Sequence, residues 1–184
     1  IYGLLGLLFL SFILLRYYTD KVAALTLLLV FFASNLMVYI VKESERVHSS
    51  LFFLISVFIW LSIKWHNKPS FLRSLGAGLI LGLITIIRPT DLIIVIVFVL
   101  FGVNGIESLK AKSLFLVKHK YLLFIFLIGF ILVILPQIIF WKNCTGDWFH
   151  YGYGDEKFFW THPKTFKMLF SLRNGWFVYS PIML

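Results

Sequence analysis

Long apolar runs alternate with short polar segments along almost the whole chain. Runs of about 20 residues recur, and each can cross the hydrocarbon core of a bilayer, which is about 30 Å thick. The apolar runs cover residues 1–15, 22–41, 47–63, 72–103 and 121–141. The pattern therefore predicts a polytopic helical membrane protein.

The run 72–103 is too long for one crossing, because a helix of that length would extend about 48 Å at 1.5 Å per residue. A polar tetrapeptide, RPTD at 88–91, interrupts it. Proline lacks a backbone N–H and disfavours helix in the residue before it. We therefore predict a helical hairpin with arms at about 69–88 and 90–109 and RPTD at its tip.

The predicted fold is all-α, a transmembrane helical bundle with about five full spans and truncated helices at both ends. One transmembrane domain covers residues 1–184. The chain starts inside an apolar run, and its last residues, GWFVYSPIML, begin another helix. We therefore expect an internal fragment of a larger protein. The last full span precedes a long polar segment, 142–175.

Composition agrees with a membrane location, since only 14% of residues are charged, against about 25% in soluble domains. The net charge is +9, and segments 16–21, 64–73 and 104–120 are each net basic. Positive loops orient helices toward the cytoplasm, so this charge indicates membrane topology and not a nucleic-acid partner. Segments 42–46, 88–91 and 142–175 are then outside, which predicts a multi-pass protein of the bacterial inner membrane.

Arg88 is the first candidate for chemistry, because an arginine beside the membrane is costly unless it pairs or faces water. Its guanidinium can bind a phosphate bidentately, or it can pair with Asp91 and fix the hairpin tip. Thr90 or Asp91 is expected to cap the returning helix. His48, beside segment 42–46, can transfer a proton or bind a phosphate, or it is simply solvated.

The outward loop 142–175 mixes aromatic rings, glycines and carboxylates. Tyr153, Asp155 and Glu156 are candidates to line a pocket for sugar hydroxyls or an ion, the alternative being a solvated turn. Some of the rings belong to an interfacial aromatic belt. Residues 161–172 have helix-like apolar spacing and are expected to lie along the interface as an amphipathic helix.

The glycine, cysteine and histidine patterns of the sequence further limit the possible packing, disulfide and metal sites. Gly78 and Gly82 form a GxxxG pair, which predicts close packing of two membrane helices. Cys144 is the only cysteine, so no internal disulfide can form. No HExxH or similar spacing occurs in the sequence, and no protein metal site is predicted.

Four segments resemble bacterial membrane glycosyltransferases with the glycosyltransferase-C (GT-C) fold, relatives of the dolichyl-phosphate-mannose protein mannosyltransferases and the lipid A aminoarabinose transferases. GLILGLITIIRPTDLIIV (78–95) resembles their GxxxGLxxxxRPT hairpin, and PQIIFWKNCTGDWFHYGYGDE (136–156) the segment before their later outward loop. LFSLRNGWFVYSP (169–181) is similar to the re-entry into the membrane. RVHSSLFFL (46–54) resembles a helix start, although it lacks the serine before its histidine.

This resemblance implies transfer of a sugar from a polyprenyl-phosphate donor to a glycan, lipid or protein acceptor on the outer face, with a divalent cation as an optional cofactor. The catalytic aspartate is expected before Ile1. Arg88 is then the principal candidate for the lipid phosphate and His48 a weaker one. Tyr153, Asp155, Glu156 and Arg173 are the further candidates for substrate or lipid-phosphate binding.

Two other classes of function remain open at this point. One is a transporter or flippase for a lipid-linked or anionic solute, with Arg88 as its anchor. The other is a non-catalytic membrane assembly subunit. Against the first, the chain shows no internal repeat and RPTD is predicted at a surface, whereas transporters commonly combine repeats with broken helices near the bilayer centre.

Overall fold

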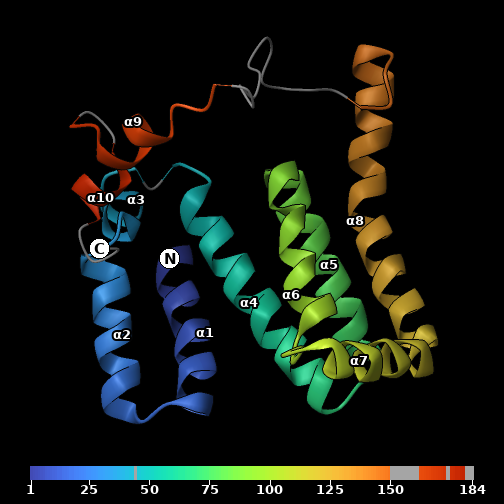
Figure 1. Cartoon of the computed structure of the whole chain (residues 1–184). Helices are drawn as coiled ribbons and strands as arrows, with labels where there is room; N and C mark the ends of the chain where they lie inside the picture. Colours follow the sequence, from blue (N-terminus) through green and yellow to red (C-terminus); the bar gives the residue numbers. More distant parts are fainter. Residues whose placement is uncertain (44, 150–161, 173–174, 181–184) are drawn as a thin grey trace.

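A computed structural model describes residues 1–43, 45–149, 162–172 and 175–180. These residues are predominantly helical, with no strand among them, which confirms the all-α class (Figure 1). The elements in chain order are α1 (Tyr2–Tyr17), α2 (Asp20–Phe32), α3 (Leu36–Val41), α4 (His48–Asn67), α5 (Phe71–Ile87), the 3₁₀ helix η1 (Pro89–Ile94), α6 (Val95–Leu100), α7 (Ile106–Lys118), α8 (Lys120–Thr145), α9 (Thr165–Phe170) and α10 (Trp176–Tyr179).

Two helices among the described residues are long and apolar enough to cross a membrane. They are α4, with 20 residues, and α8, with 26. Three shorter apolar helical stretches accompany them, namely α1, α5 and the continuous segment Pro89–Leu100. The structure therefore gives a helical protein with two candidate membrane spans.

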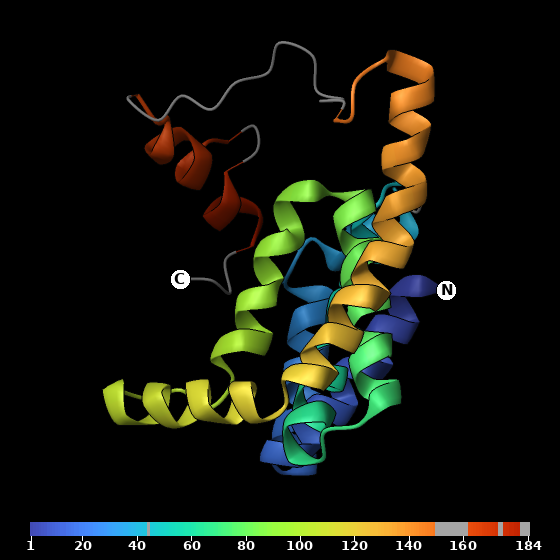
Figure 2. The same ribbon diagram turned by 90° about the vertical axis from the view of Figure 1, so that its right-hand side faces the viewer.

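The longer helices run up and down beside one another, and α7 lies across one end of them (Figures 1 and 2). That end also carries the turn between α1 and α2 and the turn between α4 and α5. We call it the basic end, because the segments 16–21, 64–73 and 104–120 that form it contain nine lysines and arginines against two acidic residues. The RPTD corner, α3 and the last turn of α8 lie at the opposite end.

The core lies between α4, α5 and α6. Phe58 and Trp65 of α4, Ala77 and Ile84 of α5, and Phe98 of α6 are all at most 2% exposed and belong to one apolar cluster. Large rings from neighbouring helices meet there, with the centroids of Trp65 and Phe98 4.9 Å apart. This cluster fixes the positions of the helices whose ends carry the candidate site.

The GxxxG prediction is confirmed by the contact between α5 and α8. A Cβ atom added to Gly78 would overlap the carbonyl oxygen of Phe126, and one added to Gly82 would lie 2.7 Å from Cβ of Val133. Gly129 makes the reciprocal approach from α8, where an added Cβ would lie 2.6 Å from the carbonyl oxygen of Leu75. Small residues on both helices thus allow their backbones to touch, as in close-packed membrane helices.

The predicted span 22–41 is not one continuous helix. It is divided into α2 and α3 at residues 33–35. The Ser34 hydroxyl bonds to the carbonyl of Val30 and also accepts a hydrogen bond from the backbone N–H of Leu36 at 3.2 Å. A serine that bonds to nearby backbone groups competes with the helical ladder, and here it accompanies the end of α2.

The second arm of the predicted hairpin, 90–109, ends earlier than expected. It begins as η1, continues as α6 and stops at Leu100. Gly102 follows with φ of 79°, a left-handed conformation that glycine adopts at little cost. The segment 104–120, expected to be a loop, instead contains α7. The Ser108 hydroxyl accepts the backbone N–H of Gly105 at 2.9 Å at the start of that helix.

The predicted loop 142–175 also contains helix. The last full span, expected over 121–141, continues to Thr145 as α8, so residues 142–145 are helical. In the segment expected to form an amphipathic helix, 161–172, the described residues are helical only over α9, residues 165–170. A short helix, α10, follows the loop, but it has only four residues and ends at Tyr179, because Ser180 leaves the helical conformation with φ −137° and ψ 66°.

Candidate functional site

The corner at Arg88 is formed by the proline that follows it. Arg88 has φ −149° and ψ 101°, an extended conformation of the kind that proline favours in the preceding residue. Its backbone N–H still donates to the carbonyl of Ile84 at 2.9 Å, so the backbone of Arg88 is bonded to the last turn of α5. Pro89 then begins η1. The sequence therefore fixes the arginine at the end of a well-packed helix.

The side chain of Arg88 pairs with Asp91 and also reaches solvent. Its Nε lies 3.6 Å from Oδ1 of Asp91, and the side chain is 46% exposed. The backbone N–H of Asp91 donates to the carbonyl of Arg88 at 3.0 Å, which closes the turn. Both interpretations of Arg88 are thus compatible, because the pair exists while the guanidinium stays accessible to a ligand.

The capping prediction for Thr90 and Asp91 is wrong. Neither residue is an N-cap, since both lie inside η1, which starts at Pro89 after Arg88. The hydroxyl of Thr90 donates instead to Oδ1 of Asp91 at 3.3 Å. The carboxylate therefore receives a hydroxyl and a guanidinium, an arrangement that orients Arg88 and leaves the helix start without a side-chain cap.

His48 has a packing contact that the sequence pattern did not indicate. It is the first residue of α4, and its half-buried ring lies against Tyr39 of α3 with the centroids 4.2 Å apart. Next to it, the Ser49 hydroxyl donates to the carbonyl of Tyr39 at 3.0 Å. His48 therefore helps to join α3 to α4 and is not merely solvated.

Because α4 and α5 are antiparallel neighbours, His48 and Arg88 lie at the same end of the bundle (Figure 1). No hydrogen bond or ion pair joins them within the part of the chain that the structure describes. In the nearby segment 42–46, Nε of Arg46 lies 2.9 Å from Oε2 of Glu43, so these two charges are engaged with one another. The candidate residues at this end therefore lie on neighbouring helices, but their side chains do not form one connected site among the described residues.

Four predicted site residues, Tyr153, Asp155, Glu156 and Arg173, lie outside the described residues. Within the described ranges, no group of three or more His, Cys, Asp or Glu side chains could hold a metal ion. The side chain of Cys144, near the end of α8, is exposed.

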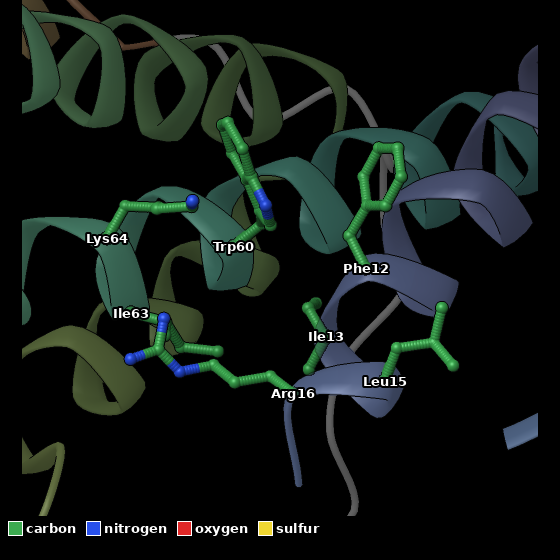
Figure 3. A pocket seen from close by; sticks show the side chains of 7 residues that line it. All are labelled: Phe12, Ile13, Leu15, Arg16, Trp60, Ile63 and Lys64. Atoms are coloured by element: carbon green, nitrogen blue, oxygen red, sulfur yellow. The ribbon is translucent and has the colours of Figure 1, made fainter. Parts of the chain in front are cut away.

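Two pockets at the basic end were not predicted. The first lies between the last turns of α1 and α4 and has a volume of about 440 Å³ (Figure 3). It contains two cations, Arg16 and Lys64, and each of them follows the end of an apolar run. That position is the only feature of the sequence that could have indicated this pocket. Their sequence separation hides the pairing, because only the packing of α1 on α4 brings them together.

The second pocket lies beneath α7 and has a volume of about 400 Å³. Its only lysine, Lys112, is 8% exposed and donates from Nζ to the carbonyl of Phe101 at 3.1 Å. The ammonium lies 6.0 Å from the ring centroid of Phe101 and 5.7 Å from that of Phe115. Cation–π contacts of this kind favour the charged amine, whereas burial opposes it.

We predict that the docking of α7 strengthens as the pH rises. Burial lowers the pKa of the Lys112 amine from 10.5 to about 8. The unfolded chain then binds more protons than the folded one between these values, so the free energy of unfolding increases with pH in that window, by about 1 kcal/mol once hydration of the amine is allowed for. Thermal unfolding in detergent at about pH 7.5 and about pH 10 measures this.

Lys112→Met should remove the pH dependence, while Lys110→Met, at an exposed position of the same helix, should retain it. An equal slope in both variants would assign the effect to another group.

Comparison with known proteins identifies no relative of this chain. No family model, curated protein or solved structure matches the chain. The functional interpretation therefore depends on the residues themselves, above all on the Arg88 corner.

Proposed function

We propose that the chain is part of an integral-membrane glycosyltransferase of the GT-C type, in which Arg88 contacts the phosphate of a polyprenyl-phosphate sugar donor. The sugar passes to a glycan, lipid or protein acceptor on the outer face. The observation that carries the proposal is the Arg88 corner, an exposed guanidinium held at the end of the apolar helix α5. It is supported by the resemblance of the segments at 46–54, 78–95, 136–156 and 169–181 to this class of enzyme.

The proposal includes a membrane orientation. The basic end faces the cytoplasm, in agreement with the preference of positive segments for that side. Segments 42–46, 88–91 and 142–175 are then outside, in a multi-pass protein of the bacterial inner membrane with about five spans. Arg88 lies at the outer ends of α5 and η1, where the phosphate of a lipid donor would be at headgroup depth.

The chemistry of sugar transfer fits a cation at this place. A lipid phosphate leaves with negative charge, which a fixed guanidinium stabilises as it develops. Asp91 is engaged with Arg88 and Thr90, so we assign it the positioning of the guanidinium. The carboxylate that deprotonates the acceptor is a separate group.

A transport function is less well supported. Substrate sites of secondary transporters lie near the bilayer midplane, at interruptions within membrane helices. Arg88 instead follows the last residue of α5, at the end of the bundle (Figure 1). Labelling of a Thr90→Cys variant from the outside tests this placement directly, and inaccessibility in every state would favour a buried transport site.

We predict that Arg88→Ala weakens binding of a polyprenyl phosphate by about 10- to 100-fold, the range expected for loss of a charge-assisted hydrogen bond. The measurement is binding of undecaprenyl phosphate to the purified chain in nanodiscs, together with sugar transfer from the lipid-linked donor by the full-length enzyme in membranes.

Arg46→Ala is the matched control for that measurement. It removes an arginine from the same end of the bundle, one that is 61% exposed and paired with Glu43. Binding by this variant should remain at the level of the unmodified chain. If Arg88→Ala binds and turns over like the unmodified protein, Arg88 has no part in the mechanism and the proposal loses its principal support.

A further inference from the structure

The pocket between α1 and α4 lies at the basic end, opposite the Arg88 corner. Seven residues line it, four from the last turns of α1 and three from α4: Phe12, Ile13, Leu15, Arg16, Trp60, Ile63 and Lys64. Figure 3 shows the Arg16 guanidinium reaching from α1 toward Ile63, while the Lys64 amine points to the Trp60 ring. The two cations thus come from different helices and share one cavity.

Neither cation has an anionic partner among the described residues, where no carboxylate lies within ion-pair distance of Arg16 or Lys64. Lys64 Nζ lies 5.4 Å from the centroid of the Trp60 ring, and Cζ of Arg16 lies 5.9 Å from that of Tyr17. Aromatic rings orient these charges without neutralising them. The positive charge of the pocket is therefore not neutralised by the described residues and can bind an anion from outside the chain.

The remaining walls are apolar and reach the outside of the bundle. Phe12 is 47% and Leu15 is 50% exposed, whereas Ile63 is 4% exposed and belongs to the buried wall. The cavity of about 440 Å³ is large for a single ion. Its composition suits a ligand with an anionic head and an apolar chain, the two parts of a membrane lipid.

We propose that this pocket binds an anionic phospholipid, with the headgroup phosphate between Arg16 and Lys64 and an acyl chain along Phe12 and Leu15. Basic pockets between helices at the cytoplasmic side are suited to anionic headgroups, and cations at helix ends lie at that depth by extending toward the interface. The site goes beyond the proposed sugar transfer. It requires only that the helices lie in a membrane, so its test is independent of Arg88.

The lipid, as opposed to a soluble phosphate, is favoured by the position of the cations. Both end apolar helical segments, so an acyl chain anchored beside them meets apolar side chains and not water. Inorganic phosphate could make the charge contacts but would gain nothing from Phe12 and Leu15. Each cation near an anionic headgroup contributes about fivefold in affinity.

The test uses the full chain in detergent, titrated with phosphatidylglycerol or phosphatidylcholine that carry the same brominated acyl chains. Quenching of Trp60 reports binding at the pocket, and the difference between the chain and its Trp60→Phe variant isolates that signal from the other tryptophans. We expect phosphatidylglycerol to quench at lower concentration than phosphatidylcholine. Arg16→Gln or Lys64→Gln should each weaken this preference about fivefold, and the double variant about 25-fold.

Lys110→Gln is the matched control, because it removes a positive charge from an exposed position at the same end without touching the pocket. It should leave the lipid preference unchanged. Equal quenching by the two lipids, or an undiminished preference in the double variant, would overturn the proposal. Competition by inorganic phosphate as effective as that by the lipid would also overturn it, since the site would then recognise phosphate alone.

Discussion

Gly78→Ala should destabilise the packing of α5 on α8 by about 3 kcal/mol, since overpacking against a rigid neighbour costs 1–3 kcal/mol and occasionally more. An added Cβ would overlap the Phe126 carbonyl oxygen and lie 2.9 Å from its carbonyl carbon and 3.0 Å from the backbone nitrogen of Phe130. These are backbone atoms inside a helix, so no side-chain rotation relieves the overlap. Thermal unfolding in detergent, followed by circular dichroism, measures the loss.

Gly76→Ala provides a control in the same helix. A Cβ at that position would meet only Cδ1 of Leu61 at 3.6 Å, an ordinary van der Waals distance. Alanine is about 1 kcal/mol more favourable than glycine inside a helix, so this variant should be as stable as the unmodified chain or more stable. The same chemical change would then have opposite signs two residues apart. An equal gain in stability in both variants would mean that helix propensity, and not contact with α8, decides.

Local features of the sequence predicted the parts of the fold that depend on local physics. The arginine before Pro89 marks the corner because proline acts on its immediate neighbours, and the pair of Arg88 with Asp91 lies within one turn. The Gly78–Gly82 spacing predicted close packing, although not that α8 is the partner. A local feature also accompanies the break at Ser34, namely the hydrogen bond from the Leu36 N–H to the Ser34 hydroxyl, which the long apolar run of 22–41 concealed.

Other features depend on contacts between distant positions, which hydrophobic periodicity does not encode. The segment 104–120 was expected to be a basic loop, yet it contains α7, and Lys112 is a buried residue of that helix whose amine donates to the Phe101 carbonyl. The ring contact of His48 with Tyr39 joins two separate helices. The pocket of Arg16 and Lys64 likewise exists only once α1 and α4 are packed together.

Trp65→Ala should be among the most destabilising single substitutions in the described chain, at about 3–4 kcal/mol. Its ring is fully buried and contacts the rings of Phe98 on α6 and Phe115 on α7, with centroids 4.9 and 5.7 Å away. Within a membrane the transfer term is reduced, because lipid is as apolar as the core, but the cavity and the lost contacts remain. Since the ring joins α4 to α6 and α7, hydrogen exchange should increase over α7 as well as at the site itself.

The contribution of the Trp65 indole hydrogen bond to stability can be measured separately from the contribution of its ring packing. The Trp65 indole N–H donates to the Ser74 hydroxyl at 2.7 Å, and both groups are buried. Ser74→Ala leaves that N–H without an acceptor, which costs about 1–3 kcal/mol, whereas the double variant with Trp65→Phe removes donor and acceptor together. The double variant should therefore lose about 1 kcal/mol less than the sum of the single losses. The bond from the Ser74 hydroxyl to the carbonyl of Ser70 is lost whether or not Trp65 is present, so it cancels from the cycle. Additive losses would show that the hydrogen bond contributes nothing and that packing of the indole alone holds α4 to α5 at this point.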